Sequence, residues 1–163
     1  MFLLIVARSR WVQFAQIPDL LVQFDDKRHI RGMTRADPTA AEFEEIARRT
    51  LEQLPQQFRS ELQCVSIRIA EFATAEQLAD LGIEDRFELT GLYEGTPLTE
   101  QSVWAATEMP AVISLFRQPL LLEMRETGVG LEELVRHVYI HEAGHHFGFS
   151  DEDMHALEDM VED

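Results

Sequence analysis

Cysteine is almost missing from this chain of 163 residues, which contains only Cys64. A single cysteine cannot form an internal disulfide, and it cannot supply a multi-cysteine zinc site. This scarcity is compatible with a reducing compartment, so we expect a cytoplasmic protein. Cys64 begins an apolar stretch, Cys-Val-Ser-Ile, where a buried packing role is favoured over a reactive thiol.

Long apolar runs and basic side chains are also scarce. No stretch reaches the roughly 18 apolar residues that a membrane-spanning helix needs. The apolar run at the start, MFLLIV, lacks the basic leader and the cleavage site of a secretory signal. Acidic residues number 30 against 14 basic ones, which gives a net charge of −16. Such a negative charge repels phosphate backbones and anionic lipids, so we do not expect nucleic acid or membrane surfaces as partners. We interpret the acidic excess as a contribution to solubility.

The chain is short enough for one domain, and its 45% of hydrophobic residues can form a core. Residues 1–36 mix apolar and basic residues without a clear period, which indicates an N-terminal extension of uncertain order. Either translation begins at Met33, or the extension is a short strand or appendage packed on the domain. We expect the folded domain at residues 37–163, and the pattern leaves its oligomeric state open.

The elements of this domain follow from hydrophobic period and from breaking residues. Helical spacing begins near Asp37, a predicted cap, and continues to Pro55. Alternation of Val65, Ile67 and Ile69 predicts a strand at 64–72, and two further strands are expected at 87–95 and 111–117. Helical patterns recur at 75–81, 119–127 and 131–146, with a last helix capped by Ser150 or Asp151. This order predicts an α+β fold: a small, mostly antiparallel or mixed sheet of about three to four strands packed with helices.

Residues 141–151, HEAGHHFGFSD, carry the clearest chemical signal. His141 and His145 are four residues apart on one helix, so their imidazoles project from the same face and can reach one zinc ion at about 2.0–2.1 Å each. Glu142 points about 100° around the helix, beside such an ion. A general base for a zinc-activated water belongs at that position.

A third ligand is needed, and the helix itself cannot supply it. Gly148 tolerates the left-handed conformation that ends a helix and turns the chain back. Asp151, three residues later, can then bring its carboxylate to the metal. The full pattern, His-Glu-x-x-His-x-x-Gly-x-x-Asp, predicts a site for one zinc ion with a fourth position left open.

The segment HEAGHHFGFSDED resembles the active-site helix of the small bacterial zincin-like metallopeptidases, which use an aspartate as third ligand. Two upstream segments, GLYEGTPLTEQS and ISLFRQPLL, resemble that family in the expected order, so the similarity covers roughly residues 39–159. The resemblance implies a zincin-like fold with the active-site helix near the C-terminus. It also implies that His141, His145 and Asp151 are zinc ligands and that Glu142 is catalytic.

These residues predict a zinc-dependent metallopeptidase, a hydrolase in which Glu142 takes a proton from a zinc-activated water. Its partner is then a peptide or protein substrate, which we expect along an edge of the sheet. Two alternatives stay open. One is a non-catalytic zinc-binding or partner-recognition domain, and the other is a regulatory peptidase for a single substrate.

Other polar residues near the motif have weaker signals. His137 lies four residues before His141 but about 12 Å along the axis from His145, too far to share the same ion. His146 is expected in packing or beside the ligands, and His155 at an exposed position. Tyr93 is more often a packing residue than an oxyanion donor in such a turn, and Glu158 is an alternative third ligand from a later helix.

Overall fold

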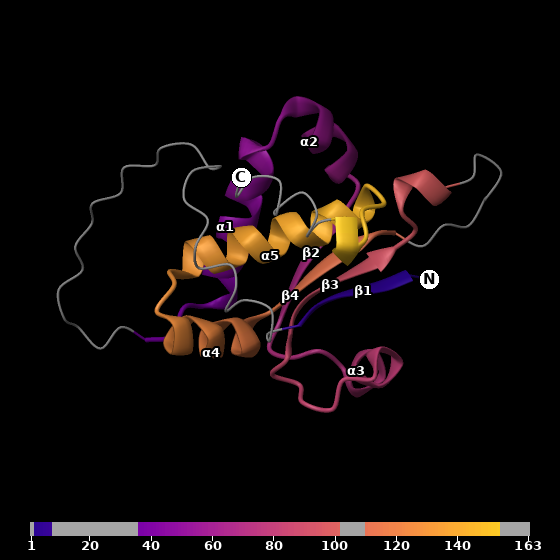
Figure 1. Ribbon diagram of the computed structural model, residues 1–163. Helices are drawn as coiled ribbons and strands as arrows, with labels where there is room; N and C mark the ends of the chain where they lie inside the picture. The colour runs from indigo at the N-terminus through magenta and orange to yellow at the C-terminus, as the bar shows by residue number, and fades with distance from the viewer. Residues whose placement is uncertain (1, 8–35, 102–109, 154–163) are drawn as a thin grey trace, which may run out of the picture.

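The computed structural model describes residues 2–7, 36–101 and 110–153 of the chain (Figure 1). Four strands form one sheet in the order β1-β3-β4-β2. The strands are β1 (Phe2–Ala7), β2 (Ser66–Ala70), β3 (Leu89–Gly95) and β4 (Val112–Phe116). β3 is antiparallel to both β1 and β4, whereas β2 is parallel to β4. The sheet is therefore mixed, and the α+β prediction is confirmed.

Helices cover one face of this sheet with a continuous apolar core. The helices are α1 (Ala40–Gln53), α2 (Gln56–Leu62), α4 (Arg117–Thr127) and α5 (Leu131–His146). α5 crosses the sheet over β3 and its neighbours, with α1 packed beside it (Figure 1). Phe43, Ile46 and Ala47 of α1 recur at helical spacing and are buried, which confirms the apolar stripe predicted there.

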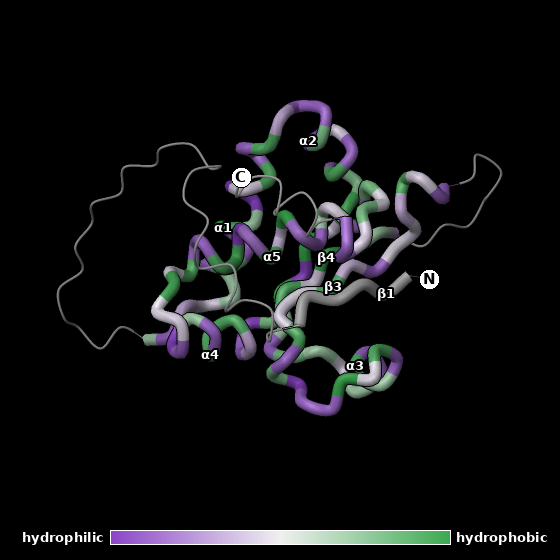
Figure 2. The backbone as a smooth tube through the Cα atoms, viewed as in Figure 1, coloured by the Kyte–Doolittle hydropathy of each residue, from purple (hydrophilic) through white to green (hydrophobic). Residues whose placement is uncertain are grey.

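The opposite face of the sheet has a smaller core under α3 (Ala75–Leu81). Leu89, Leu92 and Phe116 are buried there, with Leu78 and Leu81 of α3 packed against them. Figure 2 shows the resulting alternation of polar and apolar residues along the helices, as expected for elements with one buried side. The two faces of β3 thus contact different cores, and its α5-facing side is the one that concerns the site.

The predicted boundaries differ from the structure in several places. Thr39, not Asp37, caps α1: its side chain accepts a hydrogen bond from the Glu42 amide, and the Glu42 carboxylate accepts one from the Thr39 amide at 2.7 Å. This reciprocal arrangement satisfies two amides, whereas Asp37 pairs with Arg125 at 2.6 Å. The strand predicted at 64–72 is shorter, and α4 begins at Arg117, two residues earlier than expected.

The environment of Cys64 also differs from the prediction. Its side chain is exposed, and its thiol donates to the Glu61 carbonyl at the end of α2. The residue lies in the turn before β2, so it precedes the buried part of the strand. The expectation of a buried packing residue was therefore wrong.

The N-terminal residues contribute β1, which pairs with β3 from Phe2↔Gly95 to Ala7↔Leu89. Residues 8–35 lie outside the described part of the chain, so the boundary at residue 37 and a start at Met33 stay predictions.

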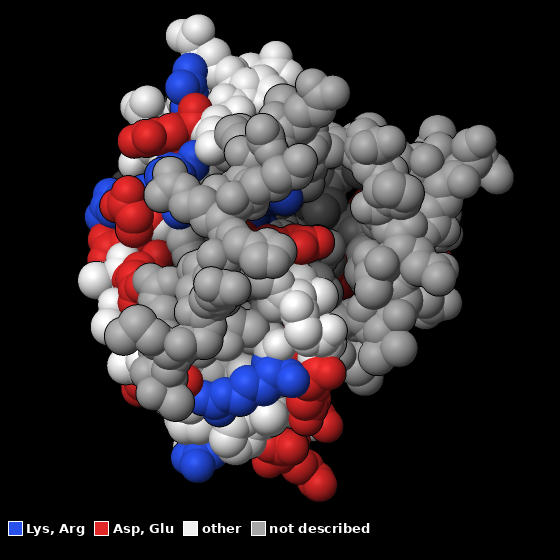
Figure 3. Space-filling view, turned by 90° about the vertical axis from the view of Figure 1, so that its left-hand side faces the viewer, with Lys and Arg blue, Asp and Glu red and all other residues white. Residues whose placement is uncertain are grey.

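Charged groups of both signs lie close together on the face shown in Figure 3. Ion pairs on the molecule include the exposed pair of Arg48 with Glu44 and the pair of the half-buried Arg117 with the exposed Glu71. Within the residues that the structure describes, no helix has both the length and the apolar character needed to cross a lipid bilayer.

Candidate metal centre

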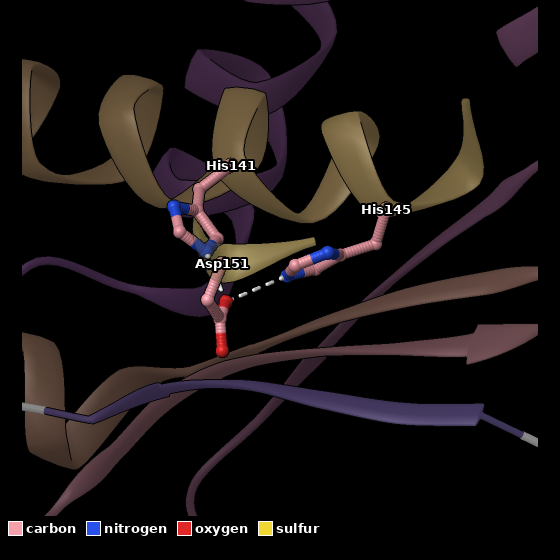
Figure 4. A group of neighbouring side chains, drawn as sticks. All are labelled: His141, His145 and Asp151. Carbon is pink, nitrogen blue, oxygen red and sulfur yellow. Dashed lines mark hydrogen bonds and ion pairs between the residues drawn. The ribbon is translucent and has the colours of Figure 1, made fainter. Parts of the chain in front are cut away.

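The last two turns of α5 place two imidazoles next to each other. His141 and His145 are 7% and 0% exposed, and their ring centroids are 4.9 Å apart. This proximity follows from their spacing of four residues on one helix. Both rings point to the same side of α5, above the sheet (Figure 4). The helix thus presents two largely buried imidazoles side by side.

The chain reverses directly after α5. Gly148 has a φ of +88°, and its amide donates to the His145 carbonyl, while the Phe149 amide donates to the Gly144 carbonyl. A Cβ at Gly148 would lie 2.5 Å from the hydroxyl of Thr99, in the short 3-10 helix η2 (Leu98–Glu100). Glycine is therefore required here by both its conformation and the available space.

A second capping arrangement starts the next helical turn at Asp151. The Ser150 hydroxyl accepts from the Asp153 amide at 3.1 Å, and the Asp153 carboxylate accepts from the Ser150 amide at 2.9 Å. Ser150 is thus the cap, one of the two predicted positions. The turn directs the Asp151 side chain back toward α5, as Figure 4 shows.

The three predicted ligands come together in space. Oδ1 of Asp151 lies 3.1 Å from Nε2 of His141 and 3.4 Å from Nε2 of His145. One ligand atom from each residue falls within 4.8 Å of the other two. Around a tetrahedral zinc ion, ligand atoms are separated by roughly 3.4 Å. The two distances to Asp151 are close to this value, and the roles of the three residues as ligands stay a prediction.

The hydrogen bonds of His145 provide a separate test of whether a cation fits. Its Nδ1 lies 2.8 Å from the Phe149 carbonyl, which can only accept, so Nδ1 carries the proton. In a neutral imidazole Nε2 is then a bare lone pair. That lone pair faces Oδ1 of Asp151 and has no hydrogen-bond partner in the described residues. A metal ion between the two acceptors would satisfy both of them.

The charge of Asp151 fits the same interpretation. Burial by itself raises the pKa of this carboxyl, but its close contacts with the imidazoles of His141 and His145 outweigh the burial and hold the pKa well below its ordinary value. Asp151 is therefore an anion at neutral pH. Two neutral imidazoles and one carboxylate are a donor set that suits zinc better than magnesium or calcium, which prefer oxygen ligands.

Glu142 occupies a different position from the three predicted ligands. Its side chain is fully buried between α5 and β3, and neither carboxylate oxygen has a hydrogen-bond partner of good geometry in the described residues. Burial raises the pKa of Glu142 well above its ordinary value, the charge of Asp151 adds to this, and the nearby Tyr93 amide opposes it. A buried carboxyl beside a candidate metal group is a typical arrangement for proton transfer.

The remaining polar residues stand apart from the ligand group. The hydroxyl of Tyr93 donates to the Thr96 carbonyl at 3.2 Å and lies 2.9 Å from Nδ1 of His146, which is fully buried. These contacts favour the packing interpretation of both residues. The ring of His137 is 6.5 Å from that of His141, and burial lowers the pKa of His137 to about 4. His155 and Glu158 lie outside the described residues.

Sequence reasoning missed two parts of this centre. The Phe149 carbonyl orients His145, but a main-chain group has no sequence signal. Gly91 lies in the middle of β3, directly against Glu142. A glycine inside a strand is a known sign of close backbone approach, so its signal was present in the segment GLYEG.

Comparison with known protein families identifies a family that matches this chain. The family model described as zincin-like metallopeptidase matches residues 62–161, more than half of the chain. The match spans β3, α5, the turn at Gly148 and Asp151. A search of curated proteins found no match.

Proposed function

Because this chain belongs to the zincin-like metallopeptidase family, we propose that it is a zinc-dependent peptidase that hydrolyses peptide bonds. The observation that carries the proposal is the convergence of His141, His145 and Asp151 beside a buried glutamate, Glu142. A site that served only to stabilise the fold would gain nothing from a buried carboxyl that lacks a well-formed hydrogen bond within the described residues, because burying such a group is costly.

The metal would be held by Nε2 of His141, Nε2 of His145 and the carboxylate of Asp151. Three protein ligands leave one position of a tetrahedral zinc ion open, which distinguishes a catalytic site from a closed structural one. When bound, zinc supplies a Lewis acid that polarises a carbonyl and lowers the pKa of water. The Phe149 carbonyl fixes the ring of His145 so that Nε2, not Nδ1, faces the ligand group.

Glu142 is the proton carrier in this proposal. Burial moves the pKa of Glu142 from its ordinary acidic value toward neutral pH, where one carboxyl can both accept and return a proton. The carboxylate takes the proton of the attacking water and then donates it to the leaving amine. Its burial against β3 restricts the side chain to few orientations and keeps bulk water away from it.

A peptide substrate would pair with an edge of the sheet by main-chain hydrogen bonds. The two edges are β1 and β2. α5 packs against β1 as well as β3, so the β1 edge is the one on the side of the metal group. We therefore place the substrate along the free edge of β1.

Metal content and turnover together test the proposal. Asp151→Ala should lose bound zinc, because two imidazoles alone hold the ion weakly, and turnover should fall with it. Glu142→Gln should keep the zinc and lose turnover. Zinc would be measured on dialysed protein, and cleavage by mass spectrometry of a diverse peptide pool.

Two outcomes contradict the proposal. Full zinc content in Asp151→Ala would remove this residue from the site. Zinc binding by the wild type without any cleavage, in the pool or in a cell extract, would leave a metal-binding domain instead of a peptidase.

A further inference from the structure

Gly91 lies in the part of β3 that faces α5, paired with Leu115 of β4 and Val6 of β1. Its φ is not in the left-handed region, so its backbone conformation does not require glycine. Space does. A Cβ built at Gly91 would lie 2.5 Å from Cγ1 of Val138, 2.9 Å from Oε1 of Glu142 and 3.1 Å from Cγ of Glu142. Real Cβ atoms are essentially never within 3.0 Å of a heavy atom from a residue that is not their own or a chain neighbour.

We propose that Gly91 is a positioning residue: the missing side chain forms the slot in which the Glu142 carboxyl is held at its working position. This inference rests on the proposed function, since it concerns the residue that carries the proton. It adds a requirement on β3, a strand that supplies none of the three ligand atoms.

The packing around the slot explains why a methyl group could not be absorbed. Val138 and Glu142 are one turn apart on the face of α5 that contacts β3, and both side chains are fully buried. α1 packs against α5, so the helix cannot simply move away from the sheet. A methyl group at residue 91 would therefore displace the Glu142 carboxyl or the end of α5.

The main test is Gly91→Ala, assayed with zinc bound. A displacement of about 1 Å at a reacting group can reduce rates about 100-fold, so we expect kcat to fall about 100-fold while KM and zinc content change little. The matched control is Gly130→Ala, at the start of α5. A Cβ there meets nothing within 4 Å and the φ is −66°, so this variant should retain wild-type turnover.

A second variant separates positioning from simple packing. Val138→Ala removes the methyl group nearest to the new Cβ and leaves Glu142 in place. In Gly91→Ala/Val138→Ala, we expect the thermal midpoint to recover toward that of Val138→Ala while kcat stays low. Recovery of kcat together with stability would show that Gly91 only accommodates Val138, and would overturn the proposal.

A stability cycle tests the same contact without any activity. Gly91→Ala and Glu142→Ala are made alone and together in metal-free protein. If Gly91 makes room for the Glu142 side chain, the drop in thermal midpoint caused by Gly91→Ala should be smaller when Glu142 is already truncated. Additive drops would overturn the proposal. If the wild type cleaves no peptide, the proposed function fails, whereas this cycle still decides whether Gly91 positions Glu142.

Discussion

Both halves of α5 contain side chains that are fully buried, but the two sets differ chemically. Leu134, Val135 and Val138 of the first half are all 0% exposed and pack into the apolar core. Glu142, His145 and His146 of the second half are also 0% exposed, yet each has a polar atom without a hydrogen-bond partner in the described residues. Apolar burial stabilises the fold, whereas unsatisfied polar burial opposes it. The first half therefore anchors α5 on the sheet, and the second half carries the residues that we propose for metal binding and proton transfer.

Glu142→Gln should separate the two halves most clearly. We expect turnover to fall about 10²–10⁴-fold, because an amide cannot carry the proton. Thermal stability of the metal-free protein should not fall, since the variant removes a buried ionisable group while keeping its shape. Paired measurements of kcat and thermal midpoint check this. A loss of stability as large as that of a core truncation would contradict the division of α5 into two halves.

Leu134→Ala should give the opposite result. Truncating a fully buried leucine lowers the free energy of unfolding by about 2–5 kcal/mol, because contacts are lost and a cavity remains. The zinc content and kcat of the protein that stays folded should be close to those of the wild type. Urea unfolding and zinc analysis at a temperature below both transitions would test this, and loss of zinc without loss of stability would be inconsistent with it.

His137 lies at the boundary between the halves and gives a smaller, pH-dependent effect. Burial lowers the pKa of His137 to about 4, and the charges of His141 and Arg136 add to this. Between about pH 6.5 and pH 4, His137 binds a proton in the unfolded chain but not in the folded one. The metal-free protein should therefore lose stability as the pH falls through this window. His137→Gln should flatten that part of the curve of unfolding free energy against pH, and an unchanged slope would exclude the effect.

Much of the fold could be predicted because local patterns and tertiary packing agree. The apolar stripe of α1 faces the core as predicted, and α3 occupies the predicted residues 75–81, ended by Gly82 with a φ of 67°. The errors occurred where local choices are nearly equal in energy. Thr39 and Asp37 can both cap a helix, and Glu42, three residues after Thr39, decided between them. Cys64 was predicted to be buried because it begins an apolar stretch that was expected to be a strand. The strand β2 begins only at Ser66, two residues after Cys64.

For the site, the sequence by itself determined that the three predicted ligands, His141, His145 and Asp151, lie close together. His141, His145, Gly148 and Asp151 lie within eleven residues, so helix geometry and one glycine turn bring them together without help from distant segments. Only the tertiary structure decided what surrounds them. Gly91 and Glu142 are 51 positions apart in the sequence, and Tyr93 and His146 are 53 positions apart. Such contacts depend on how α5 lies on β3, and that placement is set by the packing of the whole core rather than by any local pattern.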